Sequence, residues 1–277
     1  MIIAEFCQNH LGKRELLKAM IDSAASAGAW GAKIQTFFAD DLSDNWQHKF
    51  AHYKNVELTW DDHKFFVDRC RNSGMVPLTT IYDPKYLTKL RHCGFRHVKI
   101  GSAEATREHL IRQAIMNKME VIVSTGGREV DEIPNLPGVH CYMHCVSSYP
   151  GSVHEANLSR MFELRQRFNN RLIGFSDHTT PYSDNGHIPS FVASALGANY
   201  IEKHFTVLPR SEVKDGPVSI TIEQLRRLCE FDKSTPDDKF SHLGDIPLTV
   251  IFNHGRDEVD KARERKVIRD YSLRWNI

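Results

Sequence analysis

Short β-rich runs alternate with longer helical stretches along the 277-residue chain, and this alternation limits the folds that the chain can adopt. The runs are rich in apolar and β-branched residues and are bounded by Gly, Pro or charged segments, which is typical of buried strands. Between them, apolar residues recur at helical spacing, as in Leu17, Met20, Ile21 and Ala24. We expect eight strands, at residues 2–6, 31–35, 75–80, 97–101, 119–124, 139–145, 171–175 and 199–205.

This alternation predicts the fold class. Strand, helix, strand units with right-handed crossovers build a parallel sheet covered by helices, and eight repeats favour a closed barrel over an open sheet. The chain length agrees with one barrel of ~250 residues and a short extension. We therefore expect an α/β protein with a single-domain (β/α)8 TIM barrel at residues 1–235 and a C-terminal extension at 236–277.

Composition narrows the partners. A net charge of +1 gives no broad basic field, so we expect small-molecule substrates and no nucleic acid. No apolar run approaches ~18 residues and the N-terminus enters a strand directly, so we expect no membrane partner and a cytoplasmic protein. The six cysteines form no CxxC pair, and a chain of this size needs no disulfides, so reduced thiols are expected.

Candidate chemical residues recur near the carboxyl ends of the expected strands. Because the carboxyl ends of parallel barrel strands meet at one mouth, where active sites of such barrels lie, these residues predict one polar site. They are Glu5, Lys33, Thr80, Lys99, Glu104, His144, His178 and His204.

Three connections are longer than barrel loops usually are. The first, residues 36–59, is aromatic and acidic and is a candidate lid at the mouth. The others, residues 147–154 and 206–219, would face the same mouth. A charged segment at 256–274 is a candidate surface helix.

Two histidines follow neighbouring strands. His178 in FSDHT and His204 in IEKHFT come after the seventh and eighth expected strands, so their imidazoles could share a divalent metal with open positions for water or substrate. Any single histidine is more often an ordinary polar residue. Two of them at adjacent strand ends favour the metal site.

Lys33 and Lys99 also lie near strand ends, where a lysine is desolvated unless it meets an anion. A phosphate or carboxylate substrate is therefore expected. The alternative is pairing with Glu5, Glu104 or Glu202 inside the barrel.

Several hydroxyls and carboxylates leave two interpretations open. Thr80, Ser102, Ser147 and Ser176 either line the site or cap the following helices. Glu5 and Glu104 either act as general acid or base or hold a lysine in place. Cys7 and Cys145 are expected to be small core residues.

A family resemblance rests on motifs that recur in order along residues 2–231. They are AEFCQNHLG, AKIQTF, VKIGSAE, VSTGG, HCVSSYP, FSDHT and ALGANYIEKHFT. In this order they resemble the strand-end motifs of the sialic acid synthase family, which includes N-acetylneuraminate, legionaminate, pseudaminate and spore-coat relatives.

The resemblance implies condensation of phosphoenolpyruvate with an aldose, giving a 3-deoxy-2-keto acid sugar and phosphate. It implies that His178 and His204 bind Mn²⁺ or Mg²⁺, which polarises the aldehyde. It makes Glu104 a candidate for water addition or proton transfer, and Glu5 and Asp177 candidates for orienting the sugar or the metal shell. The implied substrate-binding residues are Lys33, Thr80, Lys99, Ser102, Ser147, Tyr149, Ser176 and Glu202.

Two departures concern the sugar acceptor. In the family that this chain resembles, full-length members usually have a C-terminal domain similar to type III antifreeze protein, whose arginine reaches the partner subunit's site. We expect no such domain in residues 236–277. The family's acidic residue after Gly-Pro is replaced here by Val218, for which Asp215 is a candidate substitute. Acceptor contacts from residues 37–60 or from the tail are therefore a hypothesis.

Three alternatives are compatible with the sequence. One alternative function is a barrel that binds metal or anion without catalysis. Another is a synthase for a phosphorylated aldose, for which Arg210, Lys214 and Arg128 are the candidate anion contacts. A homodimer through barrel-to-barrel contacts is also left open, because family dimers exchange the domain that we do not expect here.

Overall fold

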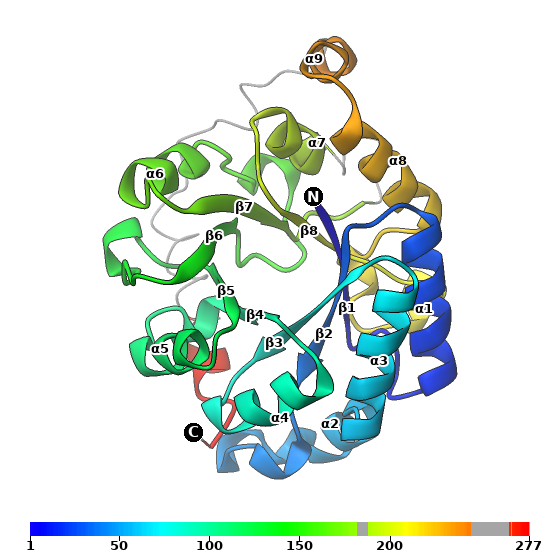
Figure 1. The fold of residues 1–277 in the computed structure, drawn as a ribbon, viewed down its shortest axis with the longest axis vertical. Helices are drawn as coiled ribbons and strands as arrows, with labels where there is room; N and C mark the ends of the chain where they lie inside the picture. Colours follow the sequence, from blue (N-terminus) through cyan, green and yellow to red (C-terminus); the bar gives the residue numbers. More distant parts are fainter. Residues whose placement is uncertain (182–187, 245–265, 267, 277) are drawn as a thin grey trace.

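The strands close into a barrel. The computed structural model describes residues 1–181, 188–244, 266 and 268–276. Each strand pairs in parallel with the next, and the eighth pairs with the first (Figure 1). The predicted (β/α)8 barrel is confirmed, with strands β1 (Ile2–Cys7), β2 (Gly31–Thr36), β3 (Val76–Ile81), β4 (His97–Ile100), β5 (Glu120–Ser124), β6 (Val139–Cys145), β7 (Leu172–Asp177) and β8 (Ile201–His204).

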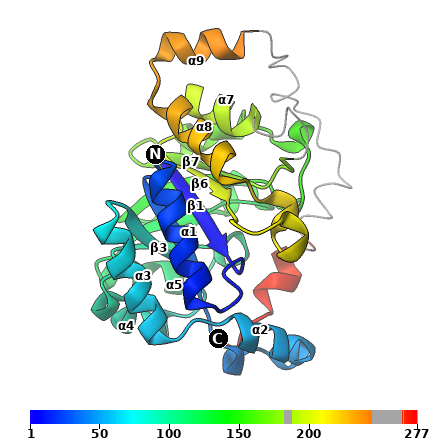
Figure 2. The same ribbon diagram turned by 90° about the vertical axis from the view of Figure 1, so that its right-hand side faces the viewer.

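Helices surround the strands, as the first view shows (Figure 1). They are α1 (Arg14–Ser26), α2 (Phe50–Val56), α3 (Trp60–Asn72), α4 (Leu87–Cys93), α5 (Glu108–Met116), α6 (Arg160–Arg167), α7 (Ile188–Ala195), α8 (Ile222–Lys233) and α9 (Pro236–Leu243). Helix α9 contacts α7 and lies at the end of the molecule opposite α2 (Figure 2). None of the described helices is long and apolar enough to cross a bilayer.

Short 3-10 helices occupy the connections. They are η1 (Ala39–Asp41), η2 (Asp44–Lys49), η3 (Pro84–Tyr86), η4 (Ser102–Glu104), η5 (Val130–Glu132), η6 (Val153–Glu155), η7 (Arg210–Glu212) and η8 (Gly216–Val218). Local capping explains where some helices begin. At the start of α3, the Thr59 side chain accepts from the Asp62 backbone and the Asp62 side chain accepts from the Thr59 backbone, which satisfies two otherwise unpaired N–H groups.

The barrel interior is divided into an apolar and a polar layer. The apolar layer is made by Ile3, Leu78, Ile122, Cys141, Met143 and Tyr200. Side chains two residues apart on a strand share a face, so the residues two positions later point into the same interior nearer the strand ends. These later residues include Glu5, Thr80 and Glu202. The barrel interior therefore has a polar layer near the carboxyl ends of the strands and an apolar layer below it.

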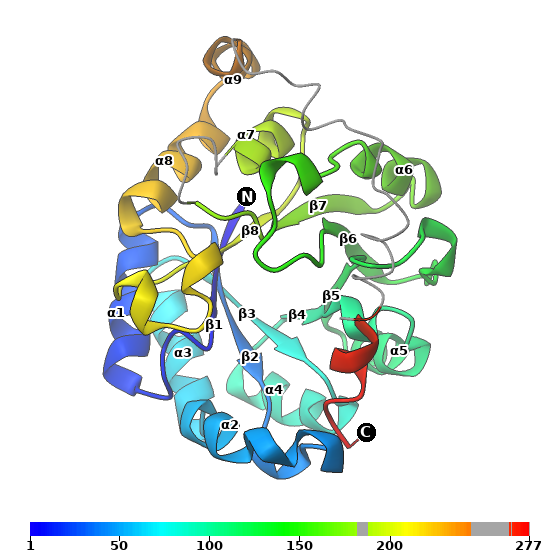
Figure 3. The ribbon, with the colours of Figure 1, turned by 180° about the vertical axis from the view of Figure 1, so that it is seen from behind.

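The long connection at 36–59 is folded, with η1, η2 and α2, and it packs against the C-terminal residues. We call this unit the aromatic cap; its buried members are Phe37, Ala39, Leu42, Tyr53, Val56, Tyr82 and Trp275. Figure 3 shows the C-terminal segment beside this connection. Leu42 forms an isolated bridge with Trp275, and the Ser43 backbone N–H donates to the Arg274 carbonyl at 3.0 Å. The candidate surface helix at 256–274 falls largely outside the described residues, which show residues 268–276 against the cap.

Candidate active site

Two lysines and two glutamates meet in the polar layer of the barrel. Lys99 Nζ donates to Glu202 Oε1 at 2.5 Å, and Lys33 Nζ lies against Glu5 Oε2 and 3.6 Å from Glu202 Oε2. All four side chains are at most 5% exposed. Of the two interpretations of the lysines, the structure shows the pairing with Glu5 and Glu202. Buried charges persist because they are paired in this way.

Two hydroxyls complete this layer. Lys33 Nζ donates to Thr80 Oγ1 at 2.7 Å, and Lys99 Nζ donates to Ser176 Oγ at 3.3 Å. The Ser176 hydroxyl in turn donates to Glu202 Oε1 at 2.9 Å. The layer thus brings together six of the residues expected from the sequence, and its carboxylates hold both ammonium groups in fixed positions.

Burial and pairing act in opposite directions on these charges. Burial lowers the pKa of Lys33 to about 7, although the nearby Glu202 carboxylate opposes the change. Burial alone would raise the pKa of Glu202, but Lys33 and Lys99 outweigh it and hold that pKa well below its usual range. An anionic ligand beside Lys33 would favour its ammonium form, so this layer is suited to binding a phosphate or carboxylate.

Ser102 and Ser147 converge at a glycine after β5. The Gly126 backbone N–H donates to Ser102 Oγ at 3.0 Å. A Cβ on Gly126 would lie only 2.5 Å from Ser147 Oγ and 2.9 Å from Ser102 Oγ, so only glycine leaves room for both hydroxyls. In the sequence, only the motif VSTGG indicated that Gly126 has a role at the site. The types of the surrounding residues did not.

The two histidines also meet. The rings of His178 and His204 lie 5.5 Å apart between centroids, and the Tyr149 ring lies 5.0 and 5.6 Å from them. His178 Nδ1 donates to the Val146 carbonyl at 2.9 Å, which leaves its Nε2 as the acceptor nitrogen. Burial lowers the pKa of His204 to about 3 and keeps its imidazole neutral, as metal binding requires.

Cys145 lies between the histidines and the polar layer that holds Lys33 and Lys99, which we call the lysine layer. Its Sγ lies 3.6 Å from His178 Nδ1, and it interacts with Ser102 and Lys99. Burial raises the pKa of the Cys145 thiol, but His178 and Lys99 outweigh it and the pKa is lowered. The lysine layer and the histidine pair therefore form one continuous site.

Cys7 and Asp215 join the histidine side of the mouth. One donor atom each from Cys7, His204 and Asp215 lies within 4.8 Å of the other two. The Tyr149 hydroxyl donates to Asp215 Oδ1 at 2.7 Å, which places Tyr149 beside this group rather than in the lysine layer. A neutral imidazole, a carboxylate and a thiolate are ligands of divalent metals, so these residues fit such an ion. Burial and the Asp215 carboxylate raise the pKa of the Cys7 thiol, so the ion would have to displace its proton. Cys7, which the sequence predicts to be a small core residue, lies instead beside His204 and Asp215.

Glu104 lies on η4, directly after β4, and is 1% exposed. Its Oε1 is buried and has no hydrogen-bond partner among the described residues. Burial raises its pKa to about 7, against the opposing charges of Arg274 and Arg107. A carboxyl group with this pKa can both donate and accept a proton near neutral pH.

Arg274 reaches the mouth from the C-terminal segment and was not anticipated from the sequence. It is 6% exposed, and its Nη1 lies 3.2 Å from the Tyr53 hydroxyl, which accepts the hydrogen bond. Its guanidinium carbon lies 4.8 Å from the Tyr82 ring centroid and 4.9 Å from that of Trp275. The aromatic cap thus holds a buried cation near Glu104.

Two expected residues are not brought to the site. Asp177 faces the helices: Ser190 Oγ donates to it at 2.5 Å, and Lys203 Nζ lies 3.0 Å away. His144 also faces outward, where it stacks on Phe175 of the outer core. Both residues are one position away from inward-facing neighbours, so the strand alternation directs them to the other face.

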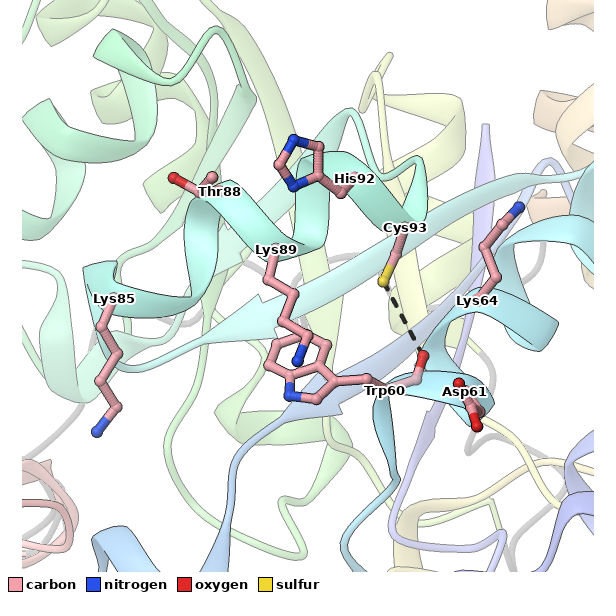
Figure 4. A pocket seen from close by; sticks show the side chains of 8 residues that line it. All are labelled: Trp60, Asp61, Lys64, Lys85, Thr88, Lys89, His92 and Cys93. Carbon is pink, nitrogen blue, oxygen red and sulfur yellow. Dashed lines mark hydrogen bonds between the residues drawn. The ribbon is translucent and has the colours of Figure 1, made fainter.

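A separate hollow lies on the outer wall. It has a volume of about 490 Å³ between α3 and α4 (Figure 4). Lys89 Nζ lies 4.6 Å from the Trp60 ring centroid, and Lys64 and Lys85 are also among its lining residues. None of the expected site residues lines this hollow.

The protein is thus a (β/α)8 barrel that holds paired buried lysines beside candidate metal ligands at the carboxyl ends of its strands. Residues 20–235 match the NeuB family. The chain therefore belongs to the NeuB family, the sialic acid synthase family, whose members are carbon–carbon bond-forming enzymes.

Individual relatives agree with this assignment. The N,N'-diacetyllegionaminic acid synthase of Legionella pneumophila is 29% identical over 255 residues, which cover 83% of this chain and 70% of that protein. The enzyme of the same name from Campylobacter jejuni is 30% identical over 253 residues, covering 83% and 74%. The crystal structure of the N-acetylneuraminic acid synthetase from Leptospira borgpetersenii in complex with citrate has a TM-score of 0.77 and 27% identity, and the match covers 97% of this chain and 92% of that one.

Proposed function

We propose that this protein condenses phosphoenolpyruvate with an aldose to give a 3-deoxy-2-keto acid and phosphate. The observation that carries the proposal is the buried lysine layer of Lys33 and Lys99, which lies next to the histidine pair at one barrel mouth. Relatives named as legionaminic, pseudaminic and N-acetylneuraminate-9-phosphate synthases support the same reaction class.

In this reaction the methylene carbon, C3, of phosphoenolpyruvate bonds to the aldehyde carbon, and the aldehyde oxygen takes up a proton to become a hydroxyl. Water adds at C2, and phosphate leaves from that carbon as the keto group forms. We assign binding of the phosphate and carboxylate to Lys33 and Lys99. Thr80 and Ser176 orient the two ammonium groups, and Ser102 and Ser147 offer hydroxyls above Gly126.

We assign the metal to His178 and His204, with Mn²⁺ or Mg²⁺ as the ion implied by the family. The bound ion supplies Lewis-acid polarisation of the aldehyde. The Val146 carbonyl fixes the His178 ring through Nδ1, as backbone carbonyls commonly orient metal-binding imidazoles.

We assign proton transfer to Glu104. Its pKa of about 7 lets it accept a proton from the water that adds at C2. Glu5 acts on Lys33, whose ammonium it holds, and its Oε1 accepts from the Cys7 backbone N–H at 2.5 Å. Glu5 is therefore a positioning residue in this proposal.

The aromatic cap and the C-terminal segment supply the acceptor side. Arg274 and Glu104 are the buried charged residues that this segment and η4 bring to the mouth. A guanidinium can donate two hydrogen bonds to sugar hydroxyl, carbonyl or carboxylate oxygens. The panel of aldoses in the experiment below identifies the acceptor. Among the candidate contacts for a phosphorylated aldose, Arg210 donates to Gln224 and Lys214 lies over the Tyr53 ring.

The test is phosphate release from phosphoenolpyruvate with added Mn²⁺, across a panel of free and phosphorylated aldoses. Release should require one aldose class and should be lost in Lys99→Ala and His178→Ala. Lys64→Ala, which changes a 54% exposed lysine on α3, is the matched control and should keep full activity. Phosphate release that survives both active-site substitutions, or no release with any aldose, would contradict the proposal.

A further inference from the structure

Three donor groups from distant parts of the chain converge at the mouth. Cys7 ends β1, His204 ends β8, and Asp215 immediately precedes η8. One donor atom from each lies within 4.8 Å of the other two, and each residue is 6% exposed. A single ion between them would contact a sulfur, a nitrogen and an oxygen.

Two of the donor side chains have unmet hydrogen-bonding capacity. Among the described residues, Asp215 Oδ2 and His204 Nδ1 are buried without a hydrogen-bond partner of normal geometry, and the neighbouring Cys7 thiol interacts with the Asp215 carboxylate. Leaving a buried polar atom unpaired costs stability, and each such atom calls for an explanation. A bound cation would provide one for the carboxylate oxygen. Meanwhile the Tyr149 hydroxyl fixes Asp215 through its other oxygen, at 2.7 Å.

The backbone at Cys7 is consistent with a placed thiol. Cys7 has a φ of 46°, in the left-handed region that residues other than glycine adopt infrequently. The pairing of β1 with β2 also shifts between Glu5 and Cys7. This local irregularity occurs at the residue that lies beside His204 and Asp215, and such conformations cluster at functional sites.

We propose that Cys7 and Asp215 join His204, and His178 beside it, as ligands of one divalent ion, and that the thiolate makes this site favour Co²⁺, Zn²⁺ or Fe²⁺ over Mg²⁺. Thiolate and imidazole select borderline transition metals, whereas Mg²⁺ prefers oxygen ligands and retains water. The inference rests on the proposed function, which uses a divalent ion at this mouth. It adds two ligands to the histidine pair and changes the expected metal preference.

Cys145 is the competing thiol at the same end of the barrel. Its sulfur lies 3.6 Å from His178 Nδ1, the nitrogen that donates to the Val146 carbonyl. Cys145 therefore approaches His178 from the side opposite its acceptor nitrogen, Nε2. It is buried like Cys7 and ends a strand like Cys7, which makes it a matched control.

The experiment is Co²⁺ titration of metal-free protein without substrates, followed by absorption spectroscopy. A thiolate ligand produces a sulfur-to-cobalt charge-transfer band in the near ultraviolet, and we expect this band in the natural protein and in Cys145→Ser. We expect Cys7→Ser to lose the band. Loss of an outer partner alone costs 10–100-fold in affinity, so loss of this ligand should weaken Co²⁺ binding by about 100-fold.

Asp215→Asn tests the carboxylate separately. It should keep the charge-transfer band but weaken Co²⁺ binding, because the amide is a poorer ligand that retains the Tyr149 contact. Mg²⁺ at high excess should not displace Co²⁺ from the natural protein. Far-ultraviolet circular dichroism and metal-free thermal unfolding establish that each variant is folded, and Cys7→Ala replaces Cys7→Ser should the latter misfold.

The outcomes separate this inference from the proposed function. A band that persists in Cys7→Ser, a band lost only in Cys145→Ser, or ready displacement by Mg²⁺ would overturn the inference whatever the enzyme's activity. A normal band in a protein that releases no phosphate would leave these ligands in place and overturn only the proposed reaction.

Discussion

Replacing Glu104 by glutamine should make the metal-free protein more stable at alkaline pH while it removes the proposed proton transfer. Burial raises the pKa of Glu104 from an ordinary value of 4.5 to about 7. Between these two values the native state binds more protons than the unfolded state. The free energy of unfolding therefore falls as pH rises through this interval. Above pH 7 the buried carboxylate is charged, and its full cost is present.

The size of this effect follows from the displacement of the pKa. At 1.36 kcal/mol per pKa unit, a change from 4.5 to about 7 corresponds to roughly 3 kcal/mol. Pairing with Arg274 is already included, because the pKa stays raised in spite of that charge. Because Glu104 is 1% exposed, solvent screening reduces this figure little. Glutamine does not titrate and avoids the cost.

The assay is urea unfolding of the natural protein and Glu104→Gln from about pH 5 to about pH 8.5. The stability difference should grow by roughly 3 kcal/mol in favour of glutamine as pH rises. Glu108→Gln, which changes a 53% exposed glutamate on α5, should show no such trend. A difference for Glu104→Gln that is independent of pH would refute the reasoning. If Glu104→Gln keeps its full kcat, the assignment of proton transfer to Glu104 is refuted.

Two further predictions concern residues outside the lysine layer. Asp177→Asn should lower the free energy of unfolding by about 3 kcal/mol, because it leaves buried Lys203 without its carboxylate, but should keep kcat. The exposed change Asp68→Asn should cost under about 1 kcal/mol, and a large kcat loss in Asp177→Asn would return Asp177 to the site. Arg274→Gln should raise the acceptor KM by about 10-fold, as loss of a charge-assisted hydrogen bond does, with the phosphoenolpyruvate KM unchanged. An acceptor KM that is the same in Arg274→Gln and in the natural protein would exclude Arg274 from acceptor binding.

The strands and the lysine layer were predictable because their signals are local. Alternation with a period of two decides which residues of a strand share a face. The expected strand at 139–145 matches β6 residue for residue, whereas 199–205 overestimates β8, which spans Ile201–His204. Strict use of the same period also separates Asp177 from Ser176, because adjacent residues on a strand point to opposite faces.

Other features depended on contacts between distant segments. The aromatic residues at 36–59 indicate a candidate lid. They pack against Trp275, which lies more than two hundred residues later in the sequence, so this contact could not be predicted from local pattern. Arg274 carries no motif, and its burial follows from the rings around it. Such convergence cannot be read from spacing, because it depends on where two connections meet in space.

By itself, the sequence determined the barrel, its family and the presence of charged residues at the strand ends, since hydrophobic period and ordered motifs are properties of neighbouring residues. Tertiary structure alone decided that Glu5 and Glu202 neutralise the lysines, and that Cys7 and Asp215 join His204. The physical reason is closure. Pairing of β8 with β1 brings the two ends of the barrel sequence together, and the connection after β8 carries Asp215 over the mouth they form.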